Sequence, residues 1–219
     1  MGLPVVYRKG SETLQNFDYS DIASGTGYSL FYGTDSRDDT TSSYHLLDNQ
    51  NYGELDVFNM TGDLTLTIDS SPFNLPRDVE GLALIGFSWL LASSSGVSTA
   101  QINAQVQKWD GTTATNIGGN VDSVELAFNG AGTTGRTSFL AIDLPLTKIK
   151  QGEQLRLVLN PTLGGNASAI IGMSPNNVSP LTAQSITLTI GEDHSAAGTN
   201  GGIIRHNQLL FNVPFRIDL

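Results

Sequence analysis

The chain has 219 residues, a length that suits one all-β domain. It carries 11 Lys and Arg against 21 Asp and Glu, and the formal charge of -10 disfavours binding to nucleic acid or to an anionic membrane. It has no cysteine, which excludes disulfides, cysteine-ligated zinc and a thiol nucleophile. Residues 1–10 contain Arg8 and Lys9 without a following apolar stretch, so we expect no signal peptide.

The first sixty residues have short apolar runs and many Asp, Ser, Tyr and Asn side chains. They predict a partly irregular N-terminal arm with edge segments over residues 1–60, followed by a β-sandwich domain over residues 61–219. Residues 18–23 fit one capped helical turn, and residues 28–32 and 44–48 are short strand candidates.

The polar loop between these two strands contains three carboxylates, Asp35, Asp38 and Asp39. Such side chains are ligands that calcium prefers, but their spacing departs from the EF-hand pattern and Arg37 lies among them. A solvated acidic turn is the favoured interpretation, and we expect no metal site.

From residue 63 onward the chain reads as a series of strands separated by Gly, Asn, Ser and Thr. Alternation of apolar and polar residues gives a strand one buried and one wet face. The run from residue 82 to 92 is apolar except at Ser88, which predicts a central strand covered on both faces, with Trp89 in the core. It is too short to cross a membrane as a helix. The other expected strands cover residues 64–68, 101–109, 112–117, 121–128, 136–144, 153–160, 167–173, 185–190 and 208–217.

The spacing of these strands fits two sheets joined by Greek-key connections, so the predicted fold class is all-β, a jelly-roll-like β-sandwich. Asp110-Gly111 is typical of a tight type I′ hairpin turn, in which both central residues need positive φ. Pro145 and Pro161 are expected just past strand ends, where a missing N–H costs nothing.

Candidate catalytic and cofactor motifs are weak. Residues 130–135 match GxGxxG, but the residues that follow predict a strand instead of the helix that a dinucleotide site requires. His45, His194 and His206 are widely spaced, and residues 192–195, although rich in polar groups, lack the GxSxG elbow of hydrolases. We therefore expect a protein that is not an enzyme and has no cofactor, although two carboxylates converging in space as a glycosidase pair are neither supported nor excluded.

Aromatic side chains offer the best candidates for recognition: Trp109, Tyr28, Phe31 and Tyr32. Aromatic rings stack on sugars and are enriched at protein interfaces. Trp109 falls on the polar face of its strand, which favours exposure. These four residues are the predicted interface or ligand platform, and a core or interface position is the more common fate of such rings.

Three segments carry a resemblance to a known class of proteins. Residues 106–118 form a strand–Asp-Gly–strand pattern, and residues 144–159 continue with Thr147, Lys148, Gly152-Glu153 and an alternating strand. Together with residues 17–33, they resemble structural proteins of bacteriophage virions.

The resemblance implies a jelly-roll-like virion protein, of the capsid decoration, minor capsid or head-fibre type, made in the host cytoplasm and placed on the capsid surface. Its implied partners are further copies of itself, in a symmetric homo-oligomer such as a trimer, and other capsid proteins. It supplies no functional residues. The alternatives are a carbohydrate-binding β-sandwich module or lectin, whose partner would be a glycan, and a hydrolase on a jelly-roll scaffold.

Overall fold

The computed structural model describes residues 26–35, 44–48, 56–62, 64–173 and 208–216, and in these ranges the protein is all-β. The strands are β1 (Thr26–Asp35), β2 (Tyr44–Leu47), β3 (Asp56–Met60), β4 (Leu66–Ser70), β5 (Arg77–Ser93), β6 (Val97–Trp109), β7 (Ala114–Asn116), β8 (Val121–Asp122), β9 (Leu126–Asn129), β10 (Gly132–Ile149), β11 (Gln154–Gly164), β12 (Ala167–Met173) and β13 (Leu210–Arg216). No helix among the described residues is long and apolar enough to cross a membrane.

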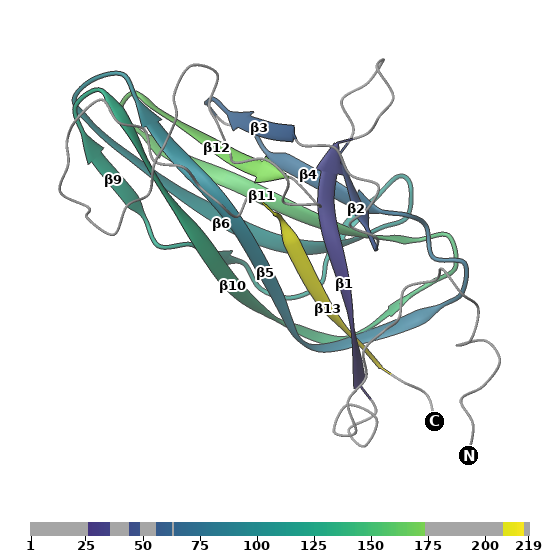
Figure 1. Ribbon diagram of the computed structural model, residues 1–219. Helices are drawn as coiled ribbons and strands as arrows, with labels where there is room; N and C mark the ends of the chain where they lie inside the picture. Colours follow the sequence, from purple (N-terminus) through teal and green to yellow (C-terminus); the bar gives the residue numbers. More distant parts are fainter. Residues whose placement is uncertain (1–25, 36–43, 49–55, 63, 174–207, 217–219) are drawn as a thin grey trace.

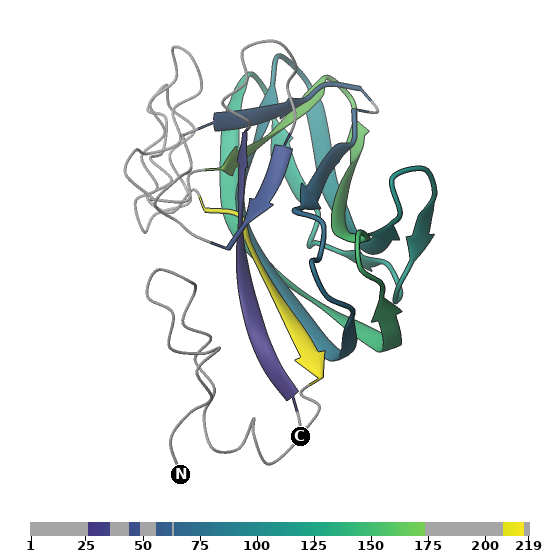
Figure 2. The same ribbon diagram turned by 90° about the vertical axis from the view of Figure 1, so that its right-hand side faces the viewer.

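The strands form one strongly curled sheet with the order β3-β12-β5-β13-β1-β2-β4-β11-β6-β7, and β10 pairs with the other edge of β5. All strand pairs are antiparallel except β2 with β4. The sheet folds back on itself, so that β10, β5, β13 and β1 form one layer and β4, β11 and β6 lie in the facing layer (Figures 1 and 2). The predicted class, an all-β, jelly-roll-like sandwich, is confirmed.

The core lies between the two layers and follows the alternation read from the sequence. In β6, Ile102, Ala104 and Val106 are fully buried, whereas the intervening residues are partly exposed. Trp89 of β5 is also fully buried, and its Nε1 donates a hydrogen bond to Ser138 Oγ at 2.9 Å. The predicted core position of Trp89 is therefore confirmed.

The expectation that residues 82–92 are covered on both faces holds for only part of β5. Residues 85–91 are buried, but Leu82 and Leu84 are exposed to 46% and 45%. Side chains alternate between the two faces of a strand. Ala83 and Ile85 point into the core, so the side chains of Leu82 and Leu84 point away from it. An apolar residue on an open sheet face gives the same sequence pattern as one under a second layer.

Two strands run through prolines that were expected at their ends. Pro145 lies inside β10, in the irregular register between Leu144 and Thr147 where the ladder with β5 is interrupted. Pro161 lies inside β11, beyond the stretch Arg156 to Leu159 that pairs with β4. In both places a missing N–H is tolerated. Pro145 lies in a bulge and Pro161 faces the side of its strand that no described strand pairs at this position, so neither position needs a backbone donor.

The hairpin after β6 reverses the chain as predicted, but its loop has four residues, since Trp109 pairs with Ala114. Asp110 spans this loop, because its Oδ1 accepts the N–H groups of Thr113 at 2.6 Å and Thr112 at 2.8 Å. Gly111 takes the positive φ of 92° that the turn needs. The two-residue turn expected from Asp110-Gly111 was therefore wrong.

The strand predicted over residues 121–128 is divided into β8 and β9. Between them, Ser123 exchanges hydrogen bonds with the backbone of Ile102: its N–H donates to the Ile102 carbonyl at 2.8 Å and its Oγ accepts the Ile102 N–H at 2.9 Å. This side-chain bond replaces a ladder bond and interrupts the strand.

Three strands from the first sixty residues, β1, β2 and β3, belong to the same sheet as the rest, and Phe31, Leu46 and Met60 lie in its core. Whether residues 61–219 fold without residues 1–60 stays a prediction. The expected helical turn at 18–23, the strand at 185–190, the loop residues Arg37, Asp38 and Asp39, the side chain of Asp35, and the polar residues 192–195 with His206 lie outside the described residues.

Candidate functional site

The most distinctive surface is the outer side of the layer formed by β1, β13, β5 and β10, which we call the outer face. The strand register places its residues in cross-strand rows. One row contains Tyr32, Leu210, Gly86 and Phe139, and the next contains Leu30, Asn212, Leu84 and Ala141. A third contains Tyr28 with Pro214 and Leu82 with Asp143. Neighbouring side chains in such rows touch, so the rows make one continuous surface.

Four large apolar side chains on the outer face are exposed: Phe139 to 79%, Leu82 to 46%, Leu84 to 45% and Leu30 to 36%. Phe139 lies against Gly86, because a Cβ placed on this glycine would come within 3.1 Å of the Phe139 ring. Gly86 therefore gives the ring a flat place on the sheet, and a side chain at this position would displace it. The outer face is consequently flat and apolar at its centre.

Charged residues appear only towards one end of the outer face, among the described residues. Asp143 lies opposite Leu82, and Glu80 forms an ion pair with Arg216 at 3.6 Å, with both side chains about half exposed. At the other end, Leu90 and Ile170 are paired, buried and outside the core cluster. The arrangement is an apolar centre with a charged border at the end near Asp143.

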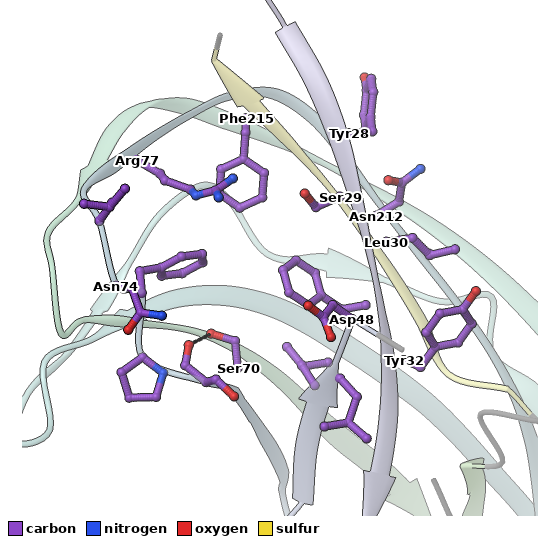
Figure 3. Close-up of a pocket in the computed structure, with 17 residues that line it drawn as sticks. Tyr28, Ser29, Leu30, Tyr32, Asp48, Ser70, Asn74, Arg77, Asn212 and Phe215 are labelled. Atoms are coloured by element: carbon purple, nitrogen blue, oxygen red, sulfur yellow. Dashed lines mark hydrogen bonds between the residues drawn. The ribbon is translucent and has the colours of Figure 1, made fainter. Parts of the chain in front are cut away.

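A hollow of about 620 Å³ adjoins the outer face at β1, where the two layers part. Figure 3 shows β1 on one side of it and Ser70, Asn74, Arg77 and Phe215 across from it. The residues that line it come from β1, β2, β13 and residues 70–77: Tyr28, Ser29, Leu30, Phe31, Tyr32, Leu46, Leu47, Asp48, Ser70, Ser71, Pro72, Phe73, Asn74, Leu75, Arg77, Asn212 and Phe215. Its volume lies within the range of small-molecule and peptide pockets.

Aromatic rings form the floor of this hollow. Phe73 and Phe215 meet edge to face, with ring centroids 5.8 Å apart, and the Arg77 guanidinium lies 5.5 Å from the Phe215 centroid. These contacts hold an apolar base under a polar rim, a combination that suits an amphipathic ligand. Asn212 adds a buried Oδ1 atom that has no hydrogen-bond partner among the residues that the structure describes. A ligand N–H or O–H that reached it would satisfy this acceptor.

Three of the four predicted platform residues, all on β1, line the hollow, whereas Trp109 does not. Tyr28 and Tyr32 lie on the outer face and line the hollow, as Figure 3 shows. Phe31, between them on β1, points inward and is only 8% exposed. Its ring packs against that of Phe211, with the ring centroids 6.4 Å apart. Trp109 lies in the other layer, at the end of β6. Their roles as interface or ligand platform stay predictions.

The Trp109 ring already has a partner. The Arg156 guanidinium lies 3.9 Å above its centroid and is held there by two hydrogen bonds to Asp69, of 2.6 and 2.8 Å. One ring face is therefore covered by a cation, so a sugar could stack only on the opposite face.

Sequence reasoning missed Leu82, Leu84 and Phe139. A signal was present in residues 139–142, Phe-Leu-Ala-Ile, which are apolar at four successive positions although β10 has one buried face. Consecutive apolar residues in an edge strand indicate either a covered outer face or an exposed apolar one.

Other candidates for chemistry prove to be structural. Residues 130 and 131 precede β10 and residues 132–135 form its first part, so the GxGxxG match runs into a strand, and the prediction that a strand follows it in place of a helix is confirmed. Glu153, a buried carboxylate, accepts the Lys150 N–H at 2.7 Å and lies 3.7 Å from Lys108, which stabilises the turn before β11. Within the described ranges, no group of three His, Asp or Glu side chains is placed to hold a metal ion.

Comparisons with known proteins identify a fold but no family. No family model and no curated protein matches the sequence. Two structures of a CocE/NonD family hydrolase from Staphylococcus aureus match with TM-scores of 0.52 and 0.50 and 10% sequence identity. They cover 87% and 88% of this chain, whereas the chain spans only 37% of each hydrolase chain. At this identity the likeness shows a shared fold alone.

Similarity to viral capsid chains is weak. A chain of the infectious bursal disease virus Gx strain matches with a TM-score of 0.26 and 9% identity, covering 84% of this chain and 40% of that chain. The VP2 protein of the same virus matches with a TM-score of 0.21 and 12% identity, covering 84% of this chain and 40% of that chain. Scores this low carry no argument, and they give no support for a bacteriophage origin.

The expectation of a protein that is not an enzyme is contradicted. Two structures that match at TM-scores of 0.52 and 0.50 belong to a hydrolase family, so this fold occurs in enzymes. The sequence could not reveal this, because a fold is shared far more widely than the motifs of a catalytic site.

Proposed function

We propose that the chain is a structural subunit that assembles through protein–protein contacts made by its outer face. The observation that supports this is the row-by-row placement of Leu30, Leu82, Leu84 and Phe139, all exposed on the outer face. Contiguous exposed apolar surface on a folded domain typically marks an interaction site. Apolar centres with charged borders are the usual anatomy of protein interfaces.

The energetics favour covering this face. Removing a Leu or Phe side chain from water stabilises an association by about 1.5–3 kcal/mol when its burial is complete. Phe139, the most exposed of the four, lies on β10 with its ring against Gly86 of β5, where it can act as an anchor residue. The partner that the face fits is a second copy of this chain, because a two-fold contact would place apolar centre on apolar centre.

The assembly that we propose is a virus particle. The resemblance of residues 106–118 and 144–159 to bacteriophage structural proteins supports a capsid-associated role, as a decoration or minor capsid subunit. Further copies of the chain and other capsid proteins are then the partners, on the capsid surface.

Sedimentation velocity over a range of concentrations tests the role of the outer face. The double variant Leu84→Ser/Phe139→Ser should remain a monomer where the unmodified chain associates. The matched control is Val97→Ser/Val124→Ser, which removes two exposed apolar side chains outside the outer face. Equal association of all three proteins, or monomers at every concentration, would contradict the proposal.

The fold likeness to hydrolases favours a second candidate, a β-sandwich module that works as part of a hydrolase. The match covers 87% of this chain and 37% of the hydrolase chain, as expected if one module of a larger enzyme were shared. Hydrolysis of chromogenic ester and amide substrates by the purified chain would support this candidate. If the turnover rate is the same in the Leu84→Ser/Phe139→Ser variant, the activity does not depend on assembly through the outer face.

A further inference from the structure

We propose that the edge of β1 beside the hollow is a strand-addition site and that its occupant is residues 3–9 of this chain. The occupant would pair with β1 through its backbone and place alternate apolar side chains in the hollow. This inference does not depend on the outer face being an interface, and the two are tested with different variants.

At Tyr28 and Leu30, β1 has an edge to which no other described strand is paired. β13 pairs with β1 along residues 26–32, but β2 pairs only with residues 32–35 on the other side. Among the described residues, no strand pairs with residues 26–31 on that second side. Such an edge is a template for pairing with another segment.

The register shows which groups face this edge. The Gly33 N–H donates to the Leu209 carbonyl at 2.9 Å, so odd-numbered residues of β1 form their backbone hydrogen bonds towards β13. In an antiparallel ladder the direction alternates from residue to residue. The N–H and C=O groups of Tyr28 and Leu30 therefore point towards the edge that β13 does not occupy.

The hollow lies directly beside these groups. Residues 70–75 bound its far side, and Phe31, Phe73 and Phe215 line it between the two layers. An incoming strand would therefore have one face over aromatic rings and the other face continuing the outer face next to Leu30. A strand that alternates apolar side chains meets both requirements.

Residues 3–9, Leu-Pro-Val-Val-Tyr-Arg-Lys, have the required pattern. Leu3, Val5 and Tyr7 share one face of an extended segment and would enter the hollow. Arg8 and Lys9 follow, and their charges complement the exposed carboxylate of Asp48 at the rim and a chain whose formal charge is -10. Pro4 has no N–H, which limits pairing to the parallel alignment in which Leu3, Val5 and Tyr7 turn their backbone groups towards β1 and Pro4 turns away from it.

The connection to β1 is long enough for this contact. Residues 10–25 separate the segment from Thr26, and a flexible linker of this length spans roughly 20–25 Å on average. This is about the length of the seven-residue stretch of β1 from Thr26 to Tyr32 at roughly 3.4 Å per residue. Covalent attachment keeps the segment near the site at an effective concentration in the millimolar range, whether it binds its own chain or a neighbouring copy.

Amide hydrogen exchange in the full chain tests the pairing, because β1 provides its own control. Tyr28 and Leu30 amides should be protected, and Val5→Asp/Tyr7→Asp should make them exchange about tenfold faster or more. The Ser29 and Phe31 amides face β13 and should be unchanged in the same variant. Rapid exchange of Tyr28 and Leu30 in the unmodified chain would overturn the proposal, and protection unaffected by the variant would overturn the choice of occupant.

Disulfide trapping gives an independent measurement, since the natural chain has no cysteine. In a strand pair, Val6→Cys would lie on the outward side with Leu30→Cys or Tyr28→Cys, within the separation that a disulfide requires. One of these two pairs should oxidise about tenfold faster than the control pair Val6→Cys/Thr162→Cys, whose second site is exposed in β11. Equal rates for all pairs would overturn the proposal, and the product mass tells whether the contact lies within one chain or between two.

Discussion

Trp89 links two neighbouring strands within the core. It is fully buried, and its indole N–H donates to Ser138 on the neighbouring strand β10. A buried Trp needs such a partner, because an unsatisfied N–H in the core costs about 1–3 kcal/mol.

We predict that Trp89→Ala lowers the free energy of unfolding by about 3–5 kcal/mol, the usual cost of removing a large core aromatic residue. Denaturant unfolding followed by circular dichroism measures this change. Phe128→Ala, at a partly buried position on the margin of the core, is the control and should cost clearly less. A near-neutral effect of Trp89→Ala would show that Trp89 does not support the core.

Asp110 is the residue whose titration the structure predicts. The backbone N–H groups of Thr113 and then Thr112 stabilise its carboxylate and hold the pKa of Asp110 below its usual range. Because the folded-state pKa is lowered, the stabilising contribution is present above the unfolded-state pKa of about 3.9 and is lost as the pH falls through the folded-state value. An NMR titration of this carboxyl group should show a midpoint below the unfolded-state value, and a midpoint equal to or above that value would contradict the hydrogen-bonded turn.

At the scale of single strands, the sequence predicts the inward face better than the outward one. The alternation of Ile102, Ala104 and Val106 identifies the buried face of β6, because polar residues separate them. In β5 the outward residues Leu82 and Leu84 are apolar as well, so the pattern could not tell an open face from a covered one.

The candidate site was harder to predict than the strands that form it. The hollow requires β1, β2, residues 70–77 and β13 to meet, and the register that brings Tyr28 beside Pro214 is a property of the folded sheet. Phe31 and Trp109 were grouped with Tyr28 and Tyr32 by residue type alone. The alternation along β1 separates Phe31 from the two tyrosines, and the position of β6 separates Trp109 from all three.

The glycan alternative leads to a prediction at the scale of these elements. Arg156 covers one face of Trp109, so any sugar should be bound by Tyr28 and Tyr32 beside the hollow instead. On a glycan array, binding should then disappear in Tyr28→Ala/Tyr32→Ala and persist in Trp109→Ala. Binding that is lost only in Trp109→Ala would place the platform in the opposite layer, and the absence of binding by the unmodified chain would remove this alternative.

At the scale of the whole molecule, a negatively charged protein presents one flat apolar face. The formal charge of -10 opposes close approach of two copies, and added salt screens this repulsion while it strengthens apolar association. We therefore predict that self-association of the unmodified chain increases with ionic strength, as measured by sedimentation velocity. Association that weakens with salt would indicate an interface of paired charges instead of the outer face.

Thiol labelling of the assembled protein tests the central claim most directly, because it locates the contact. Ala141→Cys places a unique thiol on the outer face, opposite Leu84 of β5, and Thr115→Cys places one on the exposed strand β7. At concentrations where the chain associates, the rate of labelling at position 141 should fall in proportion to the assembled fraction. The rate of labelling at position 115 should stay equal to the rate measured in the dilute monomer. Equal labelling at both positions in the assembled protein would contradict an assembly contact on the outer face.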